Sequence, residues 1–257
     1  MPRIRETCRA GATILCREFY SPSRPGKHIP RLPREKPTSE AQLMVNARKK
    51  LWDCVRYMNH NFCPGDLYIT FDYEKKNRPP DGIVLKGHGR KLKHELRKLY
   101  KKLGLELKYI YVVERGSKGA LHHHIVINQG ATIQQLRELW PYGRIHIDPL
   151  DDTGNYVKLA NYFIKYSLKT RQSGEDGEKL MSRWFDHSDN LIMPEVDRKP
   201  LWKGQVTEEP RPKKGYYIDR DSTRFYVTKE GIPVLECIYV ADGIRPKPKG
   251  RKKRRAG

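Results

Sequence analysis

The sequence lacks long hydrophobic runs, and acidic residues are scarce beside basic ones. Because about 18–20 consecutive apolar residues are needed to span a bilayer, we expect no membrane-spanning segment. The N-terminus also lacks the apolar stretch of a signal peptide. Of 257 residues, 52 are Lys or Arg and only 30 are Asp or Glu, for a formal charge of +22. We therefore expect a cytoplasmic protein with a polyanionic partner, most simply a nucleic acid.

Cysteine is also infrequent, and its pattern excludes a disulfide framework. The five cysteines are odd in number and form no C-x-x-C pair, which predicts reduced thiols. One set of candidate zinc ligands exists, although its spacing matches no regular zinc motif: Cys8, Cys16, His60 and Cys63.

Composition divides the chain into four parts. Residues 1–37 are expected to form an irregular basic arm, because five prolines lie between positions 22 and 37. Residues 38–172 have the apolar periodicity of a folded domain. Residues 173–242 are expected to form an accessory region that begins with a polar linker and contains a small β-unit. Residues 243–257 are predicted to be a disordered basic tail, since no acid follows position 245.

Apolar spacing and turn residues predict the elements of the main domain. We expect one helix that starts at residue 38 or 39 and three further helices at 91–103, 132–139 and 154–169. We expect strands at 67–71, 107–114, 120–128 and 144–147. This order is typical of an α+β fold with a mainly antiparallel central sheet and flanking helices. Further short strands are expected at 216–218, 224–227 and 234–240.

Three consecutive histidines lie in a predicted strand. Alternate side chains of a strand share a face, so His122 and His124 project together and His123 points the other way. If the five-residue loop before them closes a regular hairpin, Glu114 lies opposite Ala120, on the face of His122 and diagonal to it. Two imidazoles and a carboxylate leave open positions on a divalent ion, for which we expect Mg²⁺ or Mn²⁺. The alternative is a histidine-bearing strand that binds nucleic acid weakly.

The predicted helix at 154–169 carries two tyrosines and two lysines on one side. Tyr162, Lys165, Tyr166 and Lys169 cluster opposite the apolar stripe of this helix. A phenol has a pKa of about 10, and a nearby ammonium favours its charged form and stabilises charge on a phosphate. The tyrosines are therefore candidate nucleophiles for a phosphodiester. The alternative is an aromatic and basic surface that stacks on bases or contacts phosphates.

Together the two motifs resemble those of the HUH-type endonucleases, specifically the two-tyrosine rolling-circle replication initiators of phages and bacterial mobile elements. The paired histidines of that family correspond to His122 and His124, and an upstream acid often completes the metal set, here Glu114. The family's residue between the two histidines is usually bulky or apolar. Residues 162–169 follow the pattern Tyr-x-x-Lys-Tyr-x-x-Lys, and residues 66–71 are similar to a core strand that carries no catalytic residue.

The resemblance covers roughly residues 59–170 and implies a function. A metal-assisted nick in single-stranded DNA at a replication origin would join Tyr162 or Tyr166 to the 5′ phosphate. The free 3′ hydroxyl would prime synthesis by a host polymerase, and the displaced strand would later be rejoined. Lys165, with Lys169 as a weaker candidate, would assist the phosphate chemistry. No G-x-x-x-x-G-K-S/T loop is present, so a host helicase is expected to unwind the duplex.

Two other functions fit part of this pattern. A two-tyrosine HUH transposase would share the chemistry, whereas a conjugative relaxase usually places its tyrosine before the histidines. A non-catalytic protein that binds single-stranded nucleic acid would explain the charge and the aromatic residues. It would not explain the histidine pair and the tyrosine–lysine register together.

Overall fold

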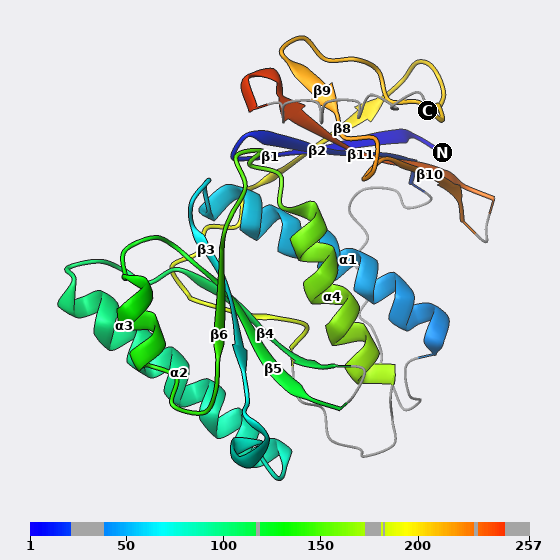
Figure 1. Ribbon diagram of the computed structural model, residues 1–257. Helices are drawn as coiled ribbons and strands as arrows, with labels where there is room; N and C mark the ends of the chain where they lie inside the picture. The colour runs from blue at the N-terminus through cyan, green and yellow to red at the C-terminus, as the bar shows by residue number, and fades with distance from the viewer. Residues whose placement is uncertain (22–38, 117–118, 173–180, 182, 229–230, 245–257) are drawn as a thin grey trace, which may run out of the picture.

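The computed structural model describes residues 1–21, 39–116, 119–172, 181, 183–228 and 231–244. Within these residues the chain forms two antiparallel sheets and four α-helices (Figure 1). The expected α+β class with a mainly antiparallel sheet is confirmed. The helices are α1 (Glu40–Asn61), α2 (Gly82–Lys102), α3 (Ile133–Glu138) and α4 (Val157–Gln172), with 3-10 turns at Lys75–Asn77 and Asp242–Ile244.

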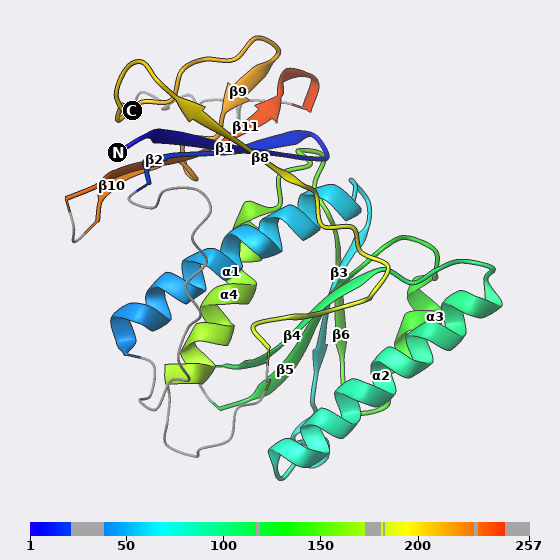
Figure 2. The same cartoon turned by 180° about the vertical axis from the view of Figure 1, so that it is seen from behind.

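The central sheet has the strand order β6-β3-β5-β4-β7, and all its pairings are antiparallel. Its strands are β3 (Leu67–Asp72), β4 (Tyr109–Arg115), β5 (Leu121–Ile127), β6 (Ile145–Pro149) and β7 (Asp186–His187). Helices α1 and α4 cover one face and α2 and α3 cover the other (Figures 1 and 2). The central strands are therefore buried on both sides, so polar side chains on them need partners inside the protein.

The outer sheet lies across α1 and α4, on the side away from the central sheet (Figure 1). Its order is β10-β11-β2-β1-β8, and β9 also pairs with β11. The strands are β1 (Arg3–Ala10), β2 (Thr13–Tyr20), β8 (Val196–Leu201), β9 (Tyr216–Ile218), β10 (Arg224–Val227) and β11 (Pro233–Ala241). The small β-unit expected near the C-terminus is thus part of a sheet built from both ends of the described chain.

The expectation of an irregular arm over residues 1–37 is wrong for the β1–β2 hairpin. Buried Ile4, Cys8 and Ala10 alternate with polar residues along β1, which is the period of a half-buried strand. The prolines that suggested irregularity lie beyond this hairpin, in residues 22–38, which are outside the described residues. Hairpin strands gain stability from neighbours, and those neighbours, β8 and β11, come from distant sequence.

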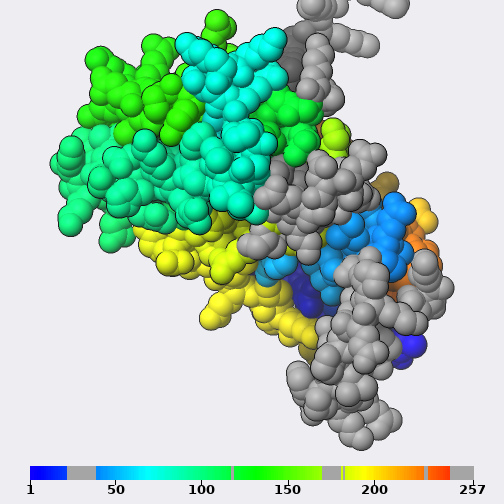
Figure 3. Space-filling view, turned by 90° about the horizontal axis from the view of Figure 1, so that it is seen from below, coloured from blue at the N-terminus to red at the C-terminus, as the bar shows by residue number. Residues whose placement is uncertain are grey.

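The segment that leads from the central to the outer sheet runs along α2. Figure 3 shows this segment, in yellow, beside the teal surface of the helix. An ion pair between Lys93 on α2 and Asp186 on β7 joins the two. The predicted linker (within residues 173–180) and residues 245–257 of the predicted basic tail lie outside the described residues, so both stay predictions. The first two residues of the predicted tail, 243 and 244, belong to the 3-10 turn at Asp242–Ile244.

Helix α2 begins nine residues before the expected start at 91. Asp81 caps it by accepting a hydrogen bond from the Val84 N–H at 2.8 Å. Glycines in the first half disguise the helical pattern, because glycine disfavours helix interiors. Gly89 has a packing reason, since a Cβ at this position would lie 2.3 Å from the hydroxyl oxygen of Tyr111. The missing side chain lets α2 lie close against the central sheet.

Candidate active site

Strand β5 directs its three histidines to opposite faces of the central sheet. His122 and His124 face α4, whereas His123 faces α2, as the strand alternation predicted. The ring centroids of His122 and His124 are 6.2 Å apart. His124 is almost fully buried and the His122 side chain is 26% exposed, so the pair extends from the core towards solvent.

The neighbouring strand β4 supplies Glu114 to the same face. Glu114 pairs directly with His122, not with Ala120, so the expected register is wrong by two positions. The turn closes later because the Gly116 N–H donates to the Ala120 carbonyl at 2.7 Å. A shift of two positions keeps side-chain parity, so Glu114 still shares the face of the histidines, as predicted.

Glu114 and His124 form the centre of a buried hydrogen-bond cluster. The His124 Nε2 and Glu114 Oε2 atoms are 2.6 Å apart, and the Tyr162 hydroxyl donates to the same carboxylate oxygen at 2.9 Å. On the other side of the imidazole, Nδ1 lies 2.8 Å from the Tyr68 hydroxyl and 3.1 Å from the Thr70 hydroxyl. Both hydroxyls come from β3, so four elements of the fold (β3, β4, β5 and α4) contribute to this cluster.

Asp72 is a site residue that the sequence did not single out. Its Oδ1 lies 2.5 Å from Nδ1 of His122, directly across the β3–β5 pair. A carboxylate on one ring nitrogen fixes the tautomer and leaves Nε2 with its lone pair, as is usual for metal-binding histidines. The signal was present in the sequence: Asp72 is two residues beyond Thr70, and so on the same face of a strand expected to lack functional residues.

Helix α4 brings the two tyrosines over this face of the sheet. The helix is anchored by three buried residues, Ala160, Phe163 and Ile164. The rings of Tyr162 and Tyr166 are 4.4 Å apart, and their centroids lie 5.4 and 6.5 Å from that of His124. Tyr162 packs partly into the core, so the tyrosines do not form a separate polar surface as the helical wheel suggested. Their hydroxyls face Glu114 instead of solvent alone.

The two lysines of the motif are exposed. Within the described residues, the Lys165 ammonium has no ion pair or hydrogen bond, although Tyr162 lies three residues before it and Tyr166 directly after it. The structure therefore unites both tyrosines, the two histidines and Glu114, and leaves Lys165 at the solvent beside them. A cation in that place can meet a substrate phosphate without first breaking an internal contact.

Burial and neighbouring charges set the protonation of the site. Burial, then Tyr68 and Glu114, raise the pKa of Tyr162 well above its usual value. Burial and Glu114 also raise the pKa of Tyr166. Burial alone would raise the pKa of the Glu114 carboxyl, but hydrogen bonds from His124 and Tyr162 outweigh it and lower the pKa. Both phenols are thus neutral near pH 7, and the carboxylate is charged.

His123 occupies a different environment on the opposite face. It is fully buried, with Nδ1 2.5 Å from the Tyr111 hydroxyl and Nε2 2.6 Å from the Tyr73 hydroxyl. Burial, and next the charge of His88, lower the pKa of His123 to about 3, so the ring is neutral. A buried neutral imidazole with both nitrogens bonded is a structural group.

The donor set suits a divalent cation in its chemistry. Two imidazole nitrogens and a carboxylate are ligands of the kind expected, and both His122 and His124 have Nδ1 engaged by neighbours. Among the described residues, however, no three His, Cys, Asp or Glu side chains are already arranged as ligands of one ion. This includes the candidate zinc set, whose Cys8 and Cys16 are buried in the outer sheet while Cys63 is exposed.

The segment that carries this geometry also matches a known family. Residues 66–171 match the family model of the replication-associated protein ORF2/G2P. The match begins just before β3 and ends within α4, so it includes every candidate site residue and omits the outer sheet. It supports the resemblance found in the motifs and is consistent with a rolling-circle replication initiator. No curated protein and no solved structure is significantly similar to the chain.

The family match suggests DNA as the partner of this segment. None of the described helices is both long enough and apolar enough to cross a membrane.

Proposed function

We propose that the protein initiates rolling-circle replication by nicking single-stranded origin DNA through attack of Tyr162 or Tyr166. The tyrosine oxygen bonds to phosphorus, and the bond from phosphorus to the 3′ oxygen breaks. The phenolic proton passes to solvent, and the 3′ oxygen takes up a proton from water. The 5′ phosphate stays on the tyrosine, so the phosphodiester energy is kept for rejoining, and the 3′ hydroxyl primes a host polymerase after a host helicase opens the duplex.

The observation that carries this proposal is the contact between helix α4 and the histidine strand. The Tyr162 hydroxyl lies 2.9 Å from Glu114, whose same oxygen lies 2.6 Å from His124. Nucleophile, imidazole and carboxylate come from α4, β5 and β4, and a protein that only stacks on bases would not need to bury them together. The raised pKa of Tyr162 means that the phenol must be activated during attack, when negative charge develops.

His122, His124 and Glu114 are the residues that would hold the divalent cation, Mg²⁺ or Mn²⁺. When bound, such an ion supplies Lewis-acid polarisation of the scissile phosphate. Asp72, Tyr68 and Thr70 orient the two imidazoles through Nδ1, which is the role of groups around a metal-binding histidine.

The second tyrosine and the exposed lysine have separate roles in the proposal. Tyr166 lies one helical turn from Tyr162, close to the same imidazole, so it can attack the regenerated origin while Tyr162 still holds a strand. Lys165 projects beside both and stabilises the charge of the phosphate from the solvent side. Lys169 is the weaker candidate for this task.

The test is covalent capture of labelled single-stranded origin DNA in the presence of Mn²⁺, read on a denaturing gel. Wild-type protein is expected to give an adduct that survives SDS. The Tyr162→Phe/Tyr166→Phe and His122→Ala/His124→Ala variants are expected to give none. Phenylalanine keeps both rings, so the tyrosine variant should stay folded and keep its affinity for the DNA, although it loses the Tyr162 hydrogen bond to Glu114.

An undiminished adduct in the tyrosine double variant would overturn the mechanism. Single variants reveal whether Tyr162 and Tyr166 are interchangeable. Wild-type protein that binds the DNA tightly but never forms an adduct, at any metal concentration, would instead identify a non-catalytic binding protein.

A further inference from the structure

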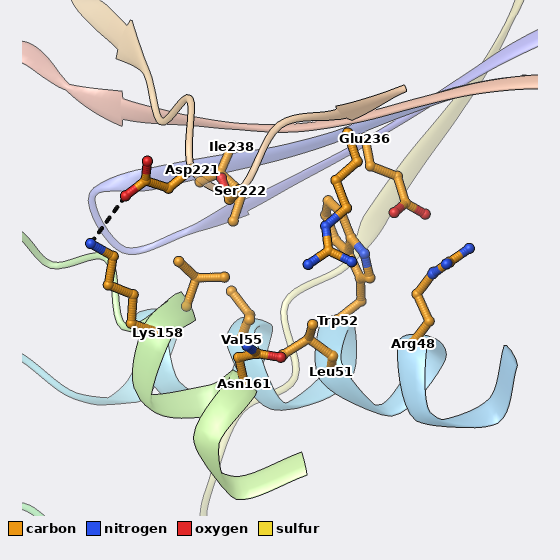
Figure 4. A pocket seen from close by; sticks show the side chains of 12 residues that line it. Arg48, Leu51, Trp52, Val55, Lys158, Asn161, Asp221, Ser222, Glu236 and Ile238 are labelled. Atoms are coloured by element: carbon orange, nitrogen blue, oxygen red, sulfur yellow. Dashed lines mark ion pairs between the residues drawn. The ribbon is translucent and has the colours of Figure 1, made fainter. Parts of the chain in front are cut away.

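A groove lies between helices α1 and α4 and the outer sheet (Figure 4). The central sheet, which carries the histidines, lies on the other side of α4 (Figure 1). Its volume is about 90 Å³. Sites that enclose a whole small ligand usually measure about 300–1,000 Å³. A groove of this size suits one group of a longer ligand that continues outside it.

The floor of the groove is apolar and includes one aromatic ring. Leu51, Trp52 and Val55 approach from α1, and Ile238 approaches from β11 (Figure 4). Trp52 is partly buried and lines the groove. Aromatic faces stack on nucleic-acid bases with little sequence preference, because every base has a π-face.

Both acids in the groove are already neutralised by basic partners. Asp221 forms an ion pair with Lys158 at 3.1 Å, at the edge of the groove (Figure 4). Glu236 is buried and forms an ion pair with Arg17 at 3.3 Å. Neither carboxylate therefore remains as a free negative charge that would repel a phosphate.

The remaining cations of the groove are two arginines. Arg48 on α1 and Arg224 on β10 are both exposed, and within the described residues neither forms an ion pair. The Arg48 guanidinium lies 4.5 Å from the ring centroid of Tyr226, a contact that holds its plane but leaves its donors available. Two such guanidiniums beside an aromatic floor match the phosphate and base of a nucleotide.

Helix α4 connects this groove to the tyrosines. Lys158 and Asn161 border the groove, and Lys165 follows them at helical spacing on the same exposed side. Lys158 and Tyr166 are separated by eight residues, or about 12 Å along the helix at 1.5 Å per residue. That distance is a few nucleotides of an extended strand, so one DNA molecule can reach both places.

We propose that the groove is a second contact for single-stranded DNA, which binds the strand that flanks the phosphate attacked by the tyrosines. Arg48 and Arg224 hold backbone phosphates, and Trp52 stacks on a base. The proposal rests on the proposed function for its ligand and adds the outer sheet to the DNA-binding surface. It gives a role to a sheet that lies outside the segment matched to the replication family.

The first test measures the salt dependence of binding to a fluorescent oligothymidylate of about 20 nucleotides, longer than the roughly 4–16 nucleotides that one single-strand site covers. Each phosphate contact contributes about 0.7 to the slope of log affinity against log salt for a single strand. The Arg48→Ala/Arg224→Ala variant is therefore expected to lower the slope by about 1.4. The control Arg90→Ala/Lys101→Ala removes two exposed charges from α2 and is expected to keep the wild-type slope.

The second test concerns the aromatic floor. Trp52→Phe keeps a π-face and is expected to bind the oligothymidylate nearly as wild type, whereas Trp52→Leu is expected to bind at least about fivefold more weakly. Thermal unfolding of both variants corrects for lost packing. Equal affinity of the two variants would exclude stacking at this position.

These outcomes are separable from the failure of the proposed function. If the wild type forms the DNA adduct but the groove and control variants have equal salt slopes, the groove proposal is wrong and the chemistry stands. If no adduct forms, but the salt slope of the groove variant falls and that of the control variant does not, the proposed cleavage is wrong and the groove remains a DNA-binding site.

Discussion

The two faces of β5 hold the same side chain in opposite roles. On the α4 face, His122 and His124 meet carboxylates that can share or balance a positive charge. On the α2 face, both ring nitrogens of His123 meet tyrosine hydroxyls within an apolar core, and burial keeps the ring neutral. The position of a histidine along the strand therefore determines which face of the sheet its side chain points to. The groups that surround the ring on that face determine its protonation and its capacity to bind a metal ion.

The largest expected difference between the faces is in DNA cleavage. We expect His122→Ala to slow adduct formation by roughly 10²–10³-fold, the usual cost of losing a group that stabilises transition-state charge. The His122 side chain is 26% exposed, so its loss should cost less stability than the loss of a fully buried ring. His123→Phe should do the reverse: it keeps cleavage but leaves the buried Tyr111 hydroxyl without its imidazole partner, at a cost of about 1–3 kcal/mol in unfolding free energy. Gel quantification and urea unfolding measure the two effects, and similar results for both variants would contradict the assignment.

A smaller effect is expected from the carboxylate that orients His122. Asp72→Ala should raise the Mn²⁺ concentration needed for half-maximal adduct formation by about 10–100-fold, because orienting partners of metal-binding histidines have effects of this size. Glu74→Ala removes an exposed carboxylate two residues further along and serves as the control. An unchanged metal requirement in Asp72→Ala would show that the contact is only structural.

The last comparison concerns stability alone, through the packing of α2 beneath His123, and it includes the smallest effect. Gly89→Ala would place a Cβ 2.3 Å from the Tyr111 hydroxyl, so we expect a loss of about 1–3 kcal/mol in unfolding free energy. Gly87→Ala meets nothing within 4 Å and should instead gain about 0.5–1 kcal/mol from helix propensity. Denaturant titration of the pair compares them, and equal shifts would mean that the close approach of α2 is not needed.

Local patterns were enough to predict the parts of the candidate site that lie on single elements. Strand alternation placed His122 and His124 together, and helical spacing placed Tyr162 and Tyr166 on one side of α4. The contribution of β3 was missed, because Asp72, at the end of a strand taken to be purely structural, meets His122 only through a pairing across the sheet. The register of Glu114 was also wrong, since turn geometry within a glycine-rich loop decides it.

The same limit explains the errors in the fold. The β1–β2 hairpin was hidden by its charge and by the prolines that follow it, and its stabilising neighbours are contributed by strands far along the chain. The start of α2 was missed because glycines weaken the helical pattern in its first half. One of them, Gly89, is needed for the close contact with Tyr111. In both cases the deciding interaction is non-local, so a window of neighbouring residues contains too little information.

By itself, the sequence determined the basic character of the protein, its α+β class and the two motifs with their order along the chain. Only the tertiary structure decided that Glu114 joins the tyrosines to the histidines, and that the two ends of the described chain share an outer sheet. The physical reason is that periodicity fixes the direction of a side chain relative to its own element. Partners, burial and charge depend on which elements pack together, and that follows from burying apolar surface across the whole chain.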